Sequence, residues 1–326
     1  MIDLKHGERY PEVLSVNLDL RKAISKKYGF KIENIIPNNG SNGSLLTIFS
    51  SIFTITNKKP SVILDVPNYF RTVHHLITFK YHIIPVKSDK DFSFPTRNYV
   101  DKMINSKPDL VILTTPNNPT GKTIPDKDLI KVLDKLPNKS IAVIDRTLTN
   151  TKSKISTNLL LKKYNAKNVV VLHSFSKTYG LSHERIGFAV TSNIKLADFL
   201  KQFVVLGLNV HAMKSAINVM KKSSLLKNKI KNIIKSHKIL TKFSQETGIK
   251  YYPSCSDYAL LKLPNNLNSV EVCNFMKKRE ISMMGGHEFD KIQGLNKKYI
   301  RIYIAEPKRL KRFIALLRKL NLNILK

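Results

Sequence analysis

HSFSKTYGLSHERIG occupies residues 173–187 and follows a short apolar stretch, NVVVL, at residues 168–172. The apolar, β-branched residues predict a buried strand, and the hydroxyl residues, lysine and glycine that follow predict a turn at its end. A lysine that leaves a buried strand in this way can be held partly out of water, where its neutral amine acts as a nucleophile. Arg185 lies eight positions after Lys177. Its planar fork of donors, together with the nearby hydroxyls, suits a phosphate group.

Two further motifs follow predicted strands. PNNPTG, at residues 116–121, comes after the apolar stretch 109–115, and Asp145 ends the apolar stretch 140–145. The prolines and the glycine restrict the backbone, so that Asn118 can be aimed from the end of its strand, where α/β sheets bind ligands. The gaps from Asn118 to Asp145 and from Asp145 to Lys177 are each long enough for a strand–helix–strand unit.

Length and composition indicate the class of protein. A chain of 326 residues can bury a large core, as one large domain with a smaller one or as two comparable domains. No run of eighteen apolar residues occurs and the first residues form no apolar run, so we expect neither a transmembrane span nor a signal peptide. Cys255 and Cys273 have no metal-ligand spacing, which indicates a reducing, cytoplasmic setting and no metal.

The formal net charge of +33 leaves two interpretations open. Such an excess can attract nucleic acid or an anionic membrane. The lysines are spread along the whole chain, which favours general solvation with some attraction for phosphorylated substrates. We therefore expect neither a nucleic-acid nor a membrane partner.

The ordered motifs resemble those of the pyridoxal-phosphate-dependent class I and II aminotransferases of fold type I, and most closely those of histidinol-phosphate aminotransferases. The resemblance covers the chain from Glu8 onward. It implies an α/β fold with a large domain built on a mixed, mostly parallel sheet and a smaller α+β domain at the C-terminus. We expect an N-terminal arm and helix at residues 1–29, the large cofactor-binding domain at 30–222 and the small domain at 223–326.

The resemblance also implies roles for single residues in the binding of pyridoxal 5′-phosphate. Lys177 is expected to form the Schiff base, Asp145 to face the pyridine nitrogen and Asn118 to bond the phenolic oxygen. Tyr69, which follows the predicted strand 61–67, is expected to stack on the ring. Arg301, in the predicted strand 299–305, is expected to bind the carboxylate of the substrate. We predict Lys177, Asp145 and Tyr69 to be the catalytic residues.

The cofactor phosphate is expected to lie between three parts of the chain. The first is the glycine-rich turn at residues 38–44, whose free N–H groups suit an anion where a helix begins. The second is the turn around Lys177, and the third is a tyrosine from the neighbouring subunit of a homodimer that shares its active sites. The residues that the resemblance assigns to the phosphate are Ser41, Asn42, Gly43, Ser174, Ser176, Arg185 and Tyr10.

The sequence departs from the family at two points. The family has Asp-x-x-Tyr, whereas this chain has Leu148 at the position of the tyrosine, so Thr147 or Thr149 is a candidate to replace the lost hydrogen bond. Fewer residues precede Tyr10 than in the family, whose longer arm covers the active site. Arg146 and His287 are candidates for contact with the substrate.

The predicted function is transfer of an amino group between an amino acid, or a similar amine, and a 2-oxo acid, in cytoplasmic amino-acid biosynthesis. Two alternatives stay open. One is a decarboxylase of the same fold that resembles threonine-phosphate decarboxylase, because the sequence does not show which substrate bond is held perpendicular to the ring. The other is a non-catalytic protein that keeps the fold for binding.

Overall fold

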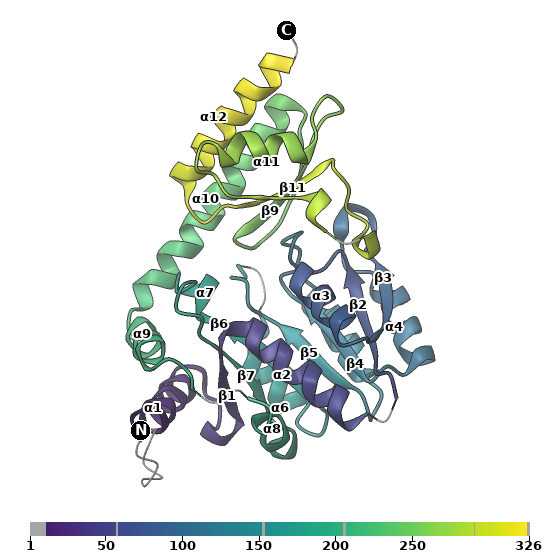
Figure 1. Ribbon diagram of the computed structural model, residues 1–326, viewed down its shortest axis with the longest axis vertical. Coiled ribbons are helices and arrows are strands. Elements are labelled where there is room, and N and C mark those ends of the chain that lie inside the picture. Colours follow the sequence, from purple (N-terminus) through teal and green to yellow (C-terminus); the bar gives the residue numbers. More distant parts are fainter. Residues whose placement is uncertain (1–10, 57, 152–153, 205–206, 290, 325–326) are drawn as a thin grey trace, which may run out of the picture.

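Two β-sheets organise the chain (Figure 1). The computed structural model describes residues 11–56, 58–151, 154–204, 207–289 and 291–324. The larger sheet has the strand order β1-β7-β6-β5-β4-β2-β3 and the smaller one the order β10-β11-β9-β8. The strands of the large sheet are β1 (Ile35–Asn38), β2 (Ser61–Val66), β3 (His82–Lys87), β4 (Leu110–Thr114), β5 (Ile141–Asp145), β6 (Val169–Ser174) and β7 (Gly187–Thr191).

The large sheet is mixed and mostly parallel, as the resemblance to fold type I implied. Strands β3, β2, β4, β5 and β6 are parallel neighbours, and β7 runs antiparallel to both β6 and β1. All five residues of β4 and of β5 are buried. Strands covered on both faces need apolar side chains on both, which explains their continuous apolar sequences.

Helices cover the two faces of the large sheet and bury separate apolar clusters. Leu20, Tyr99 and Met213 belong to the cluster on one face, and Phe49 and Leu76 to that on the other. The first face is covered by α1 (Pro11–Tyr28), α4 (Thr96–Ser106), α5 (Asp126–Asp134), α6 (Thr157–Lys163) and α9 (Val210–Met220). The second is covered by α2 (Gly40–Ile55), α3 (Phe70–Thr78) and α8 (Ile194–Lys201).

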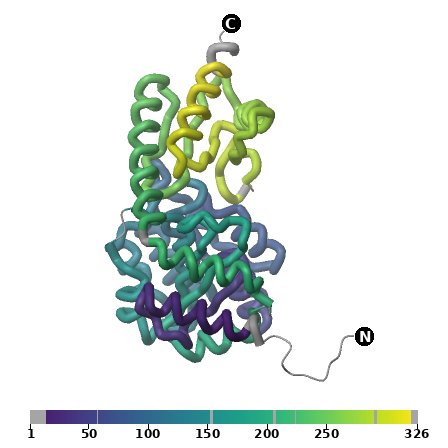
Figure 2. Tube along the Cα trace, turned by 90° about the vertical axis from the view of Figure 1, so that its left-hand side faces the viewer, coloured from purple at the N-terminus to yellow at the C-terminus, as the bar shows by residue number. Residues whose placement is uncertain are grey.

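The small sheet is antiparallel and packs on three helices. Its strands are β8 (Lys250–Tyr252), β9 (Tyr258–Lys262), β10 (Met284–Gly285) and β11 (Tyr299–Tyr303), and its helices are α10 (Ser223–Thr247), α11 (Ser269–Lys277) and α12 (Pro307–Ile324). They bury a third apolar cluster. Helix α10 runs from the part of the molecule built on the large sheet into the part built on the small one (Figures 1 and 2).

Most predicted elements occur within a few residues of their expected ends. The helix expected within residues 1–29 is α1, which runs from Pro11 to Tyr28. Short turns of 3₁₀ helix occur at Ile32–Asn34, Lys90–Phe92, Gly286–Glu288 and Lys291–Gln293. Helix α10 begins at Ser223, the first residue of the predicted small domain. The domain boundaries themselves stay a prediction.

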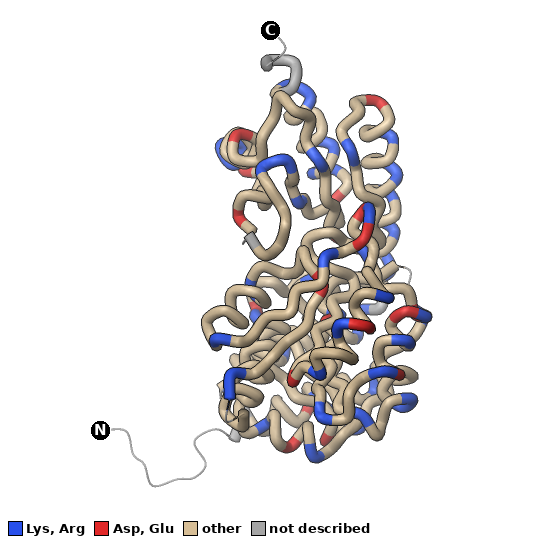
Figure 3. Tube along the Cα trace, turned by 90° about the vertical axis from the view of Figure 1, so that its right-hand side faces the viewer, with Lys and Arg blue, Asp and Glu red and all other residues tan. Residues whose placement is uncertain are grey.

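Basic residues are spread over both parts of the molecule (Figure 3). No helix in the described ranges is long and apolar enough to cross a membrane. Within the same ranges no group of three or more His, Cys, Asp or Glu side chains could hold a metal ion.

Candidate active site

A cavity of about 210 Å³ lies where the parallel strands of the large sheet end. Asp145 ends β5 and Ser174 ends β6, while Asn118 follows β4 and Tyr69 follows β2. Parallel strands present their carboxyl ends at one edge, so residues far apart in sequence meet there. The cavity is lined by Ser41, Asn42, Tyr69, Phe70, Thr114, Pro116, Asn118, Asp145, Thr147, Leu148, Ser174, Ser176, Lys177, Ser182, Arg185, Tyr258 and Arg301.

Arg185 lies against the first turn of α2. Its Nη1 donates to the carbonyl of Ser182 at 3.1 Å and lies 3.5 Å from the hydroxyl of Ser176. A Cβ atom at position 40 would lie only 3.1 Å from Arg185 Nη2, so Gly40 lets the guanidinium approach the start of the helix. Arg185 has a φ of +53°, which non-glycine residues adopt at a cost. A guanidinium beside a helix N-terminus forms a place for an anion.

The glycine-rich turn contributes two of its three predicted residues. Ser41 and Asn42 line the cavity, and the Oδ1 of Asn42 lies 3.1 Å from Nε2 of His75. Gly43 is not among the lining residues. Its N–H donates to the carbonyl of Asn39 at 3.4 Å at the start of the helix, so this donor is already used and is not directed at a ligand.

Ser174, which ends β6, and Ser176, which follows it, both line the cavity as predicted. The Oγ of Ser174 accepts the N–H of Ser176 at 3.1 Å and caps the short helix α7 (Phe175–Thr178). Its hydroxyl proton is still available for a ligand, because the cap uses only an acceptor site. Tyr10, expected to reach a neighbouring subunit, lies outside the described residues.

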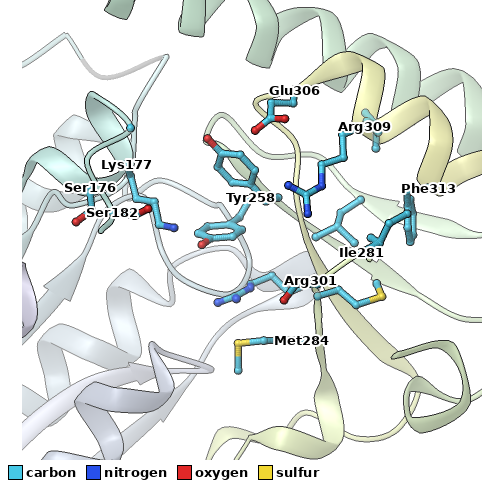
Figure 4. Close-up of a pocket in the computed structure, with 16 residues that line it drawn as sticks. Ser176, Lys177, Ser182, Tyr258, Ile281, Met284, Arg301, Glu306, Arg309 and Phe313 are labelled. Atoms are coloured by element: carbon cyan, nitrogen blue, oxygen red, sulfur yellow. The ribbon is translucent and has the colours of Figure 1, made fainter. Parts of the chain in front are cut away.

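Lys177 lies on α7 and its amine faces two tyrosine rings (Figure 4). The Nζ atom is 5.4 Å from the ring centroid of Tyr258 and 5.6 Å from that of Tyr303, within the range of cation–π attraction. The two rings pack edge to face, 5.8 Å apart, because Tyr258 and Tyr303 are directly paired in β9 and β11. We did not predict either tyrosine. The available signal was alternation in β11, which places Tyr303 on the same face as Arg301.

Asp145 is a buried carboxylate with 6% of its surface exposed. Its Oδ1 accepts the N–H of Thr147 at 2.8 Å. Burial raises the pKa of Asp145, and bonding to Thr147 opposes that rise. Among the described residues no lysine or arginine forms an ion pair with it, so a cationic group in the cavity would stabilise its charged form.

Arg301 reaches the cavity from the small sheet. Its Nη1 donates to Oδ1 of Asn118 at 2.8 Å, and its guanidinium lies 4.3 Å from the ring centroid of Tyr258. Burial lowers the pKa of Arg301. Its Nε is buried and has no hydrogen-bond partner in the described part of the chain. A buried guanidinium with a free donor is suited to a carboxylate or phosphate of a ligand.

Leu148 and Thr147 lie side by side in the cavity wall. Leu148 is buried and offers no polar atom. The hydroxyls of Thr147 and Thr149 are both buried and make no hydrogen bond of good geometry to a described residue. Only Thr147 lines the cavity, which distinguishes the two candidates for the missing tyrosine hydroxyl.

Arg146 and His287 do not line this cavity. The Nη1 of Arg146 donates to the carbonyl of Ile155 at 2.9 Å and to the hydroxyl of Thr157 at 3.2 Å. Nδ1 of His287 lies 2.7 Å from Oγ of Ser269. In this structure the two side chains are therefore bonded away from the cavity that holds the other predicted site residues.

Comparison with known proteins agrees with this geometry. A family model described as aminotransferase class I and II matches residues 8–317. A histidinol-phosphate aminotransferase of Methanococcus maripaludis is 28% identical, over 97% of this chain and 83% of that protein. The histidinol-phosphate aminotransferase of Clostridium acetobutylicum has a TM-score of 0.82 at 21% identity, over 94% of this chain and 90% of that one.

A structure from Sinorhizobium meliloti adds a bound cofactor to the comparison. This histidinol-phosphate aminotransferase, solved in complex with pyridoxal 5′-phosphate, has a TM-score of 0.77 at 20% identity and covers 94% of this chain and 82% of its own. The family-model match confirms the predicted family, and the likeness to these structures confirms the predicted fold type.

Proposed function

Because the chain belongs to the aminotransferase class I and II family, we propose that it transfers an amino group between an amine of the histidinol phosphate type and a 2-oxo acid, with pyridoxal 5′-phosphate as cofactor. The family supports the activity class and the cofactor. The names of the related proteins support the choice of amine. The observation that carries the proposal is the meeting of Lys177, Asp145, Asn118 and Arg185 around one cavity.

The residues in the cavity fit this cofactor. Asp145 is a buried carboxylate that a protonated ring nitrogen would stabilise, and the buried hydroxyl of Thr147 makes no hydrogen bond of good geometry within the described part of the chain. Arg185 and the start of α2 suit the phosphate, and Tyr69, at the N-cap of α3, offers a ring to stack on the pyridine. Ser41, Asn42, Ser174 and Ser176 surround the same end.

Pyridoxal phosphate, when bound, supplies an aldehyde that condenses with amines and a pyridine ring that takes up the electron pair released at the substrate carbon. Lys177 Nζ is the group of this chain that can hold the aldehyde and then accept the proton from that carbon. Asp145 would pair with the protonated ring nitrogen. Asn118 would donate to the phenolic oxygen through its amide N–H groups, because its Oδ1 already accepts from Arg301.

Arg301 would orient the substrate. Its buried guanidinium can bind an acidic group of the amine or of the oxo acid in a fixed direction, which holds the reacting carbon near Lys177. We further propose a cytoplasmic homodimer in which the partner subunit's Tyr10 completes the phosphate site.

Borohydride reduction of the purified protein loaded with pyridoxal phosphate tests the proposal. Reduction should fix the cofactor on Lys177, which mass spectrometry of the peptide containing residues 173–187 would detect. K177A should lose the label, whereas K139A, which removes an exposed lysine elsewhere, should keep it. A label spread over surface lysines in the wild type would contradict the proposal.

Turnover of histidinol phosphate with 2-oxoglutarate tests the reaction type. Aminotransfer should release glutamate without carbon dioxide. Carbon dioxide released from an amino acid would identify a decarboxylase instead. Labelling of Lys177 without turnover of any amine would favour the non-catalytic alternative.

A further inference from the structure

The loop that joins β10 to β11 of the small sheet reaches the large sheet where β2 ends (Figure 1). Gln293, which ends the 3₁₀ turn Lys291–Gln293 of that loop, accepts the backbone N–H of Asn68 at its Oε1 over 2.6 Å. The two residues are 225 positions apart in sequence, and only 1% and 0% of their surfaces are exposed. A hydrogen bond between groups so deeply buried cannot be exchanged for one to water unless the loop moves.

The small sheet fixes the position of Gln293. Phe289 and Leu295, on either side of it in the loop, are buried in an apolar cluster with Tyr252 of β8 and Leu260 of β9. The Nε2 of Gln293 has no hydrogen-bond partner among the residues that the structure describes. The oxygen of this side chain is therefore the atom that connects the loop to the large sheet.

Asn68 passes this connection on to Tyr69. The Oδ1 of Asn68 accepts the backbone N–H of Tyr69 at 2.7 Å and the hydroxyl of Thr114, at the end of β4, at 3.1 Å. Its Nδ2 donates to the carbonyl and to the Oδ1 of Asp65 at 3.1 and 3.2 Å. With Gln293 on its N–H, Asn68 is bonded at its backbone and at both ends of its side chain, which fixes its arrangement.

The ring of Tyr69 is also supported from its far side. Tyr69 lines the cavity, and its ring packs edge to face on that of Phe70 with the centroids 5.2 Å apart. Phe70 in turn packs against the apolar cluster that contains Phe289 and Leu295. The small sheet thus holds the Tyr69 ring at two points, through the bond to Asn68 and through the packing of Phe70.

We propose that Gln293 is a positioning residue that holds the ring of Tyr69 against the pyridine ring of the cofactor. The proposal rests on the proposed function, in which Tyr69 stacks on that ring. Aromatic rings attract each other only within a narrow range of separation and tilt, so a shift of the turn at Asn68 weakens the stacking. Gln293 is not among the residues that line the cavity, so its effect must pass through a residue that does.

Two residues of the cavity are candidates to carry that effect. Tyr69 follows Asn68 directly, whereas Arg301 lies in β11, the strand that the loop of Gln293 enters. Arg301 makes its own connection to the large sheet, at Asn118. The experiments therefore have to separate a route through Tyr69 from a route through Arg301.

Hydrogen exchange followed by mass spectrometry tests the contact without cofactor or turnover. In Q293M the side chain keeps about the same length but loses the acceptor, so the amides of Asn68 and Tyr69 should exchange at least about tenfold faster than in the wild type. Q293E keeps an acceptor oxygen and should exchange more slowly than Q293M. Q245M, at an exposed position of α10, should match the wild type. Wild-type exchange in Q293M would overturn the proposal.

Titration with pyridoxal phosphate, followed by the circular dichroism of its visible band, identifies the route. Q293M should raise the Kd of the cofactor at least about threefold and weaken the dichroism. Added to Y69A, Q293M should change Kd less than about 1.5-fold, because the ring that it positions is gone. Added to R301K, it should keep its full effect. The same change in Y69A as in the wild type would refute the route through Tyr69.

Steady-state kinetics separate this inference from the proposed function. Q293M should lower kcat at least about threefold and leave KM for the amine within about twofold, since Arg301 stays in place. Q293E should recover part of kcat. If exchange and cofactor binding respond as expected but no amine reacts, the proposed function fails and the positioning role stands. If Q293M reacts and binds the cofactor like the wild type, the positioning role fails and the proposed function stands.

Discussion

Arg301 Nη1 donates to Asn118 Oδ1 over 2.8 Å, and this bond joins the small sheet to the PNNPTG turn after β4 of the large one. The two residues are 183 positions apart in sequence. The bond fixes the orientation of the Asn118 amide, so that its N–H groups are left for a ligand. It also holds a buried guanidinium next to the cavity that contains Lys177.

Replacing Arg301 by lysine should impair the reaction while the fold persists. Lysine keeps the positive charge, but it lacks the planar guanidinium whose several N–H donors can bind an acidic group and the Asn118 oxygen at the same time. Loss of a charge-assisted hydrogen bond costs about 1.5–3 kcal/mol, so steady-state kinetics should show kcat/KM lower by roughly 10- to 150-fold. R97K, at an exposed arginine of α4, is the matched control. Unchanged kcat/KM in R301K would exclude Arg301 from substrate binding.

The Thr147 hydroxyl should lower the pH at which the bound cofactor loses its proton. If it donates to the phenolic oxygen in place of the tyrosine absent at Leu148, T147V removes a donor that stabilises the negative charge on that oxygen. The pKa that governs the visible absorption band of the loaded protein should then rise by about half a unit to one unit, as expected for the loss of about 1 kcal/mol of stabilisation. An absorbance titration measures this without turnover.

Two further variants make this titration decisive. T149V removes the neighbouring hydroxyl, which has no hydrogen-bond partner among the residues that the structure describes and does not line the cavity, and should leave the titration unchanged. L148Y restores a phenol at the position of the family tyrosine and should shift the transition to lower pH. A shift in T149V equal to that in T147V would show that neither hydroxyl acts specifically.

Asp65 should make stability depend on pH. It is buried below the PNNPTG turn, where Asn68 and Asn117 donate to it at 3.2 Å, and burial raises its pKa to about 7. Between the unfolded value of about 4 and that pH, the folded state binds a proton that the unfolded state has lost. The contribution of Asp65 to the free energy of unfolding therefore falls as pH rises, by roughly 1 kcal/mol per pH unit.

Urea unfolding of wild type and D65N from pH 4 to pH 8 measures this contribution. The difference in unfolding free energy, wild type minus D65N, should decrease with rising pH and level off above about pH 7. Stability differences that do not vary with pH would show that Asp65 stays charged throughout.

The buried ion pair between Lys229 and Asp257 should matter for stability near the site. Lys229 Nζ lies 3.0 Å from Asp257 Oδ2, and the two side chains are 12% and 0% exposed. The pair links α10 to the residue before Tyr258. Replacing Lys229 by methionine leaves a buried carboxylate unpaired and should cost about 3–5 kcal/mol in urea unfolding.

A double variant and a surface pair serve as controls for that loss. K229M with D257L should recover most of the stability, because no uncompensated charge remains. K250M breaks the exposed pair of Lys250 with Asp91 and should cost less than about 1 kcal/mol. A cost in K229M no larger than in K250M would contradict the argument.

Short local sequence patterns were enough to predict several of the strands that hold the site. The apolar runs before Asn118, Asp145 and Lys177 predicted buried strands, and β4, β5 and β6 occupy those positions. The gaps from Asn118 to Asp145 and from Asp145 to Lys177 predicted strand–helix–strand units, and α5 and α6 lie in those gaps, whereas α4 was not predicted. Gly43 was predicted at the ligand from its place in a glycine-rich turn, but the helix begins at Gly40 and takes up its N–H.

The sequence by itself determined the family, the order of the motifs and the chemical types of residue at the site, since each is local and is set by a few neighbouring positions. Only the tertiary structure decided which of these residues meet. Tyr258 and Tyr303 face Lys177, and Arg301 bonds Asn118, because the pairing of β9 with β11 and the packing of the small sheet bring distant segments together. Such contacts depend on how whole elements pack, and no short stretch of the chain specifies that.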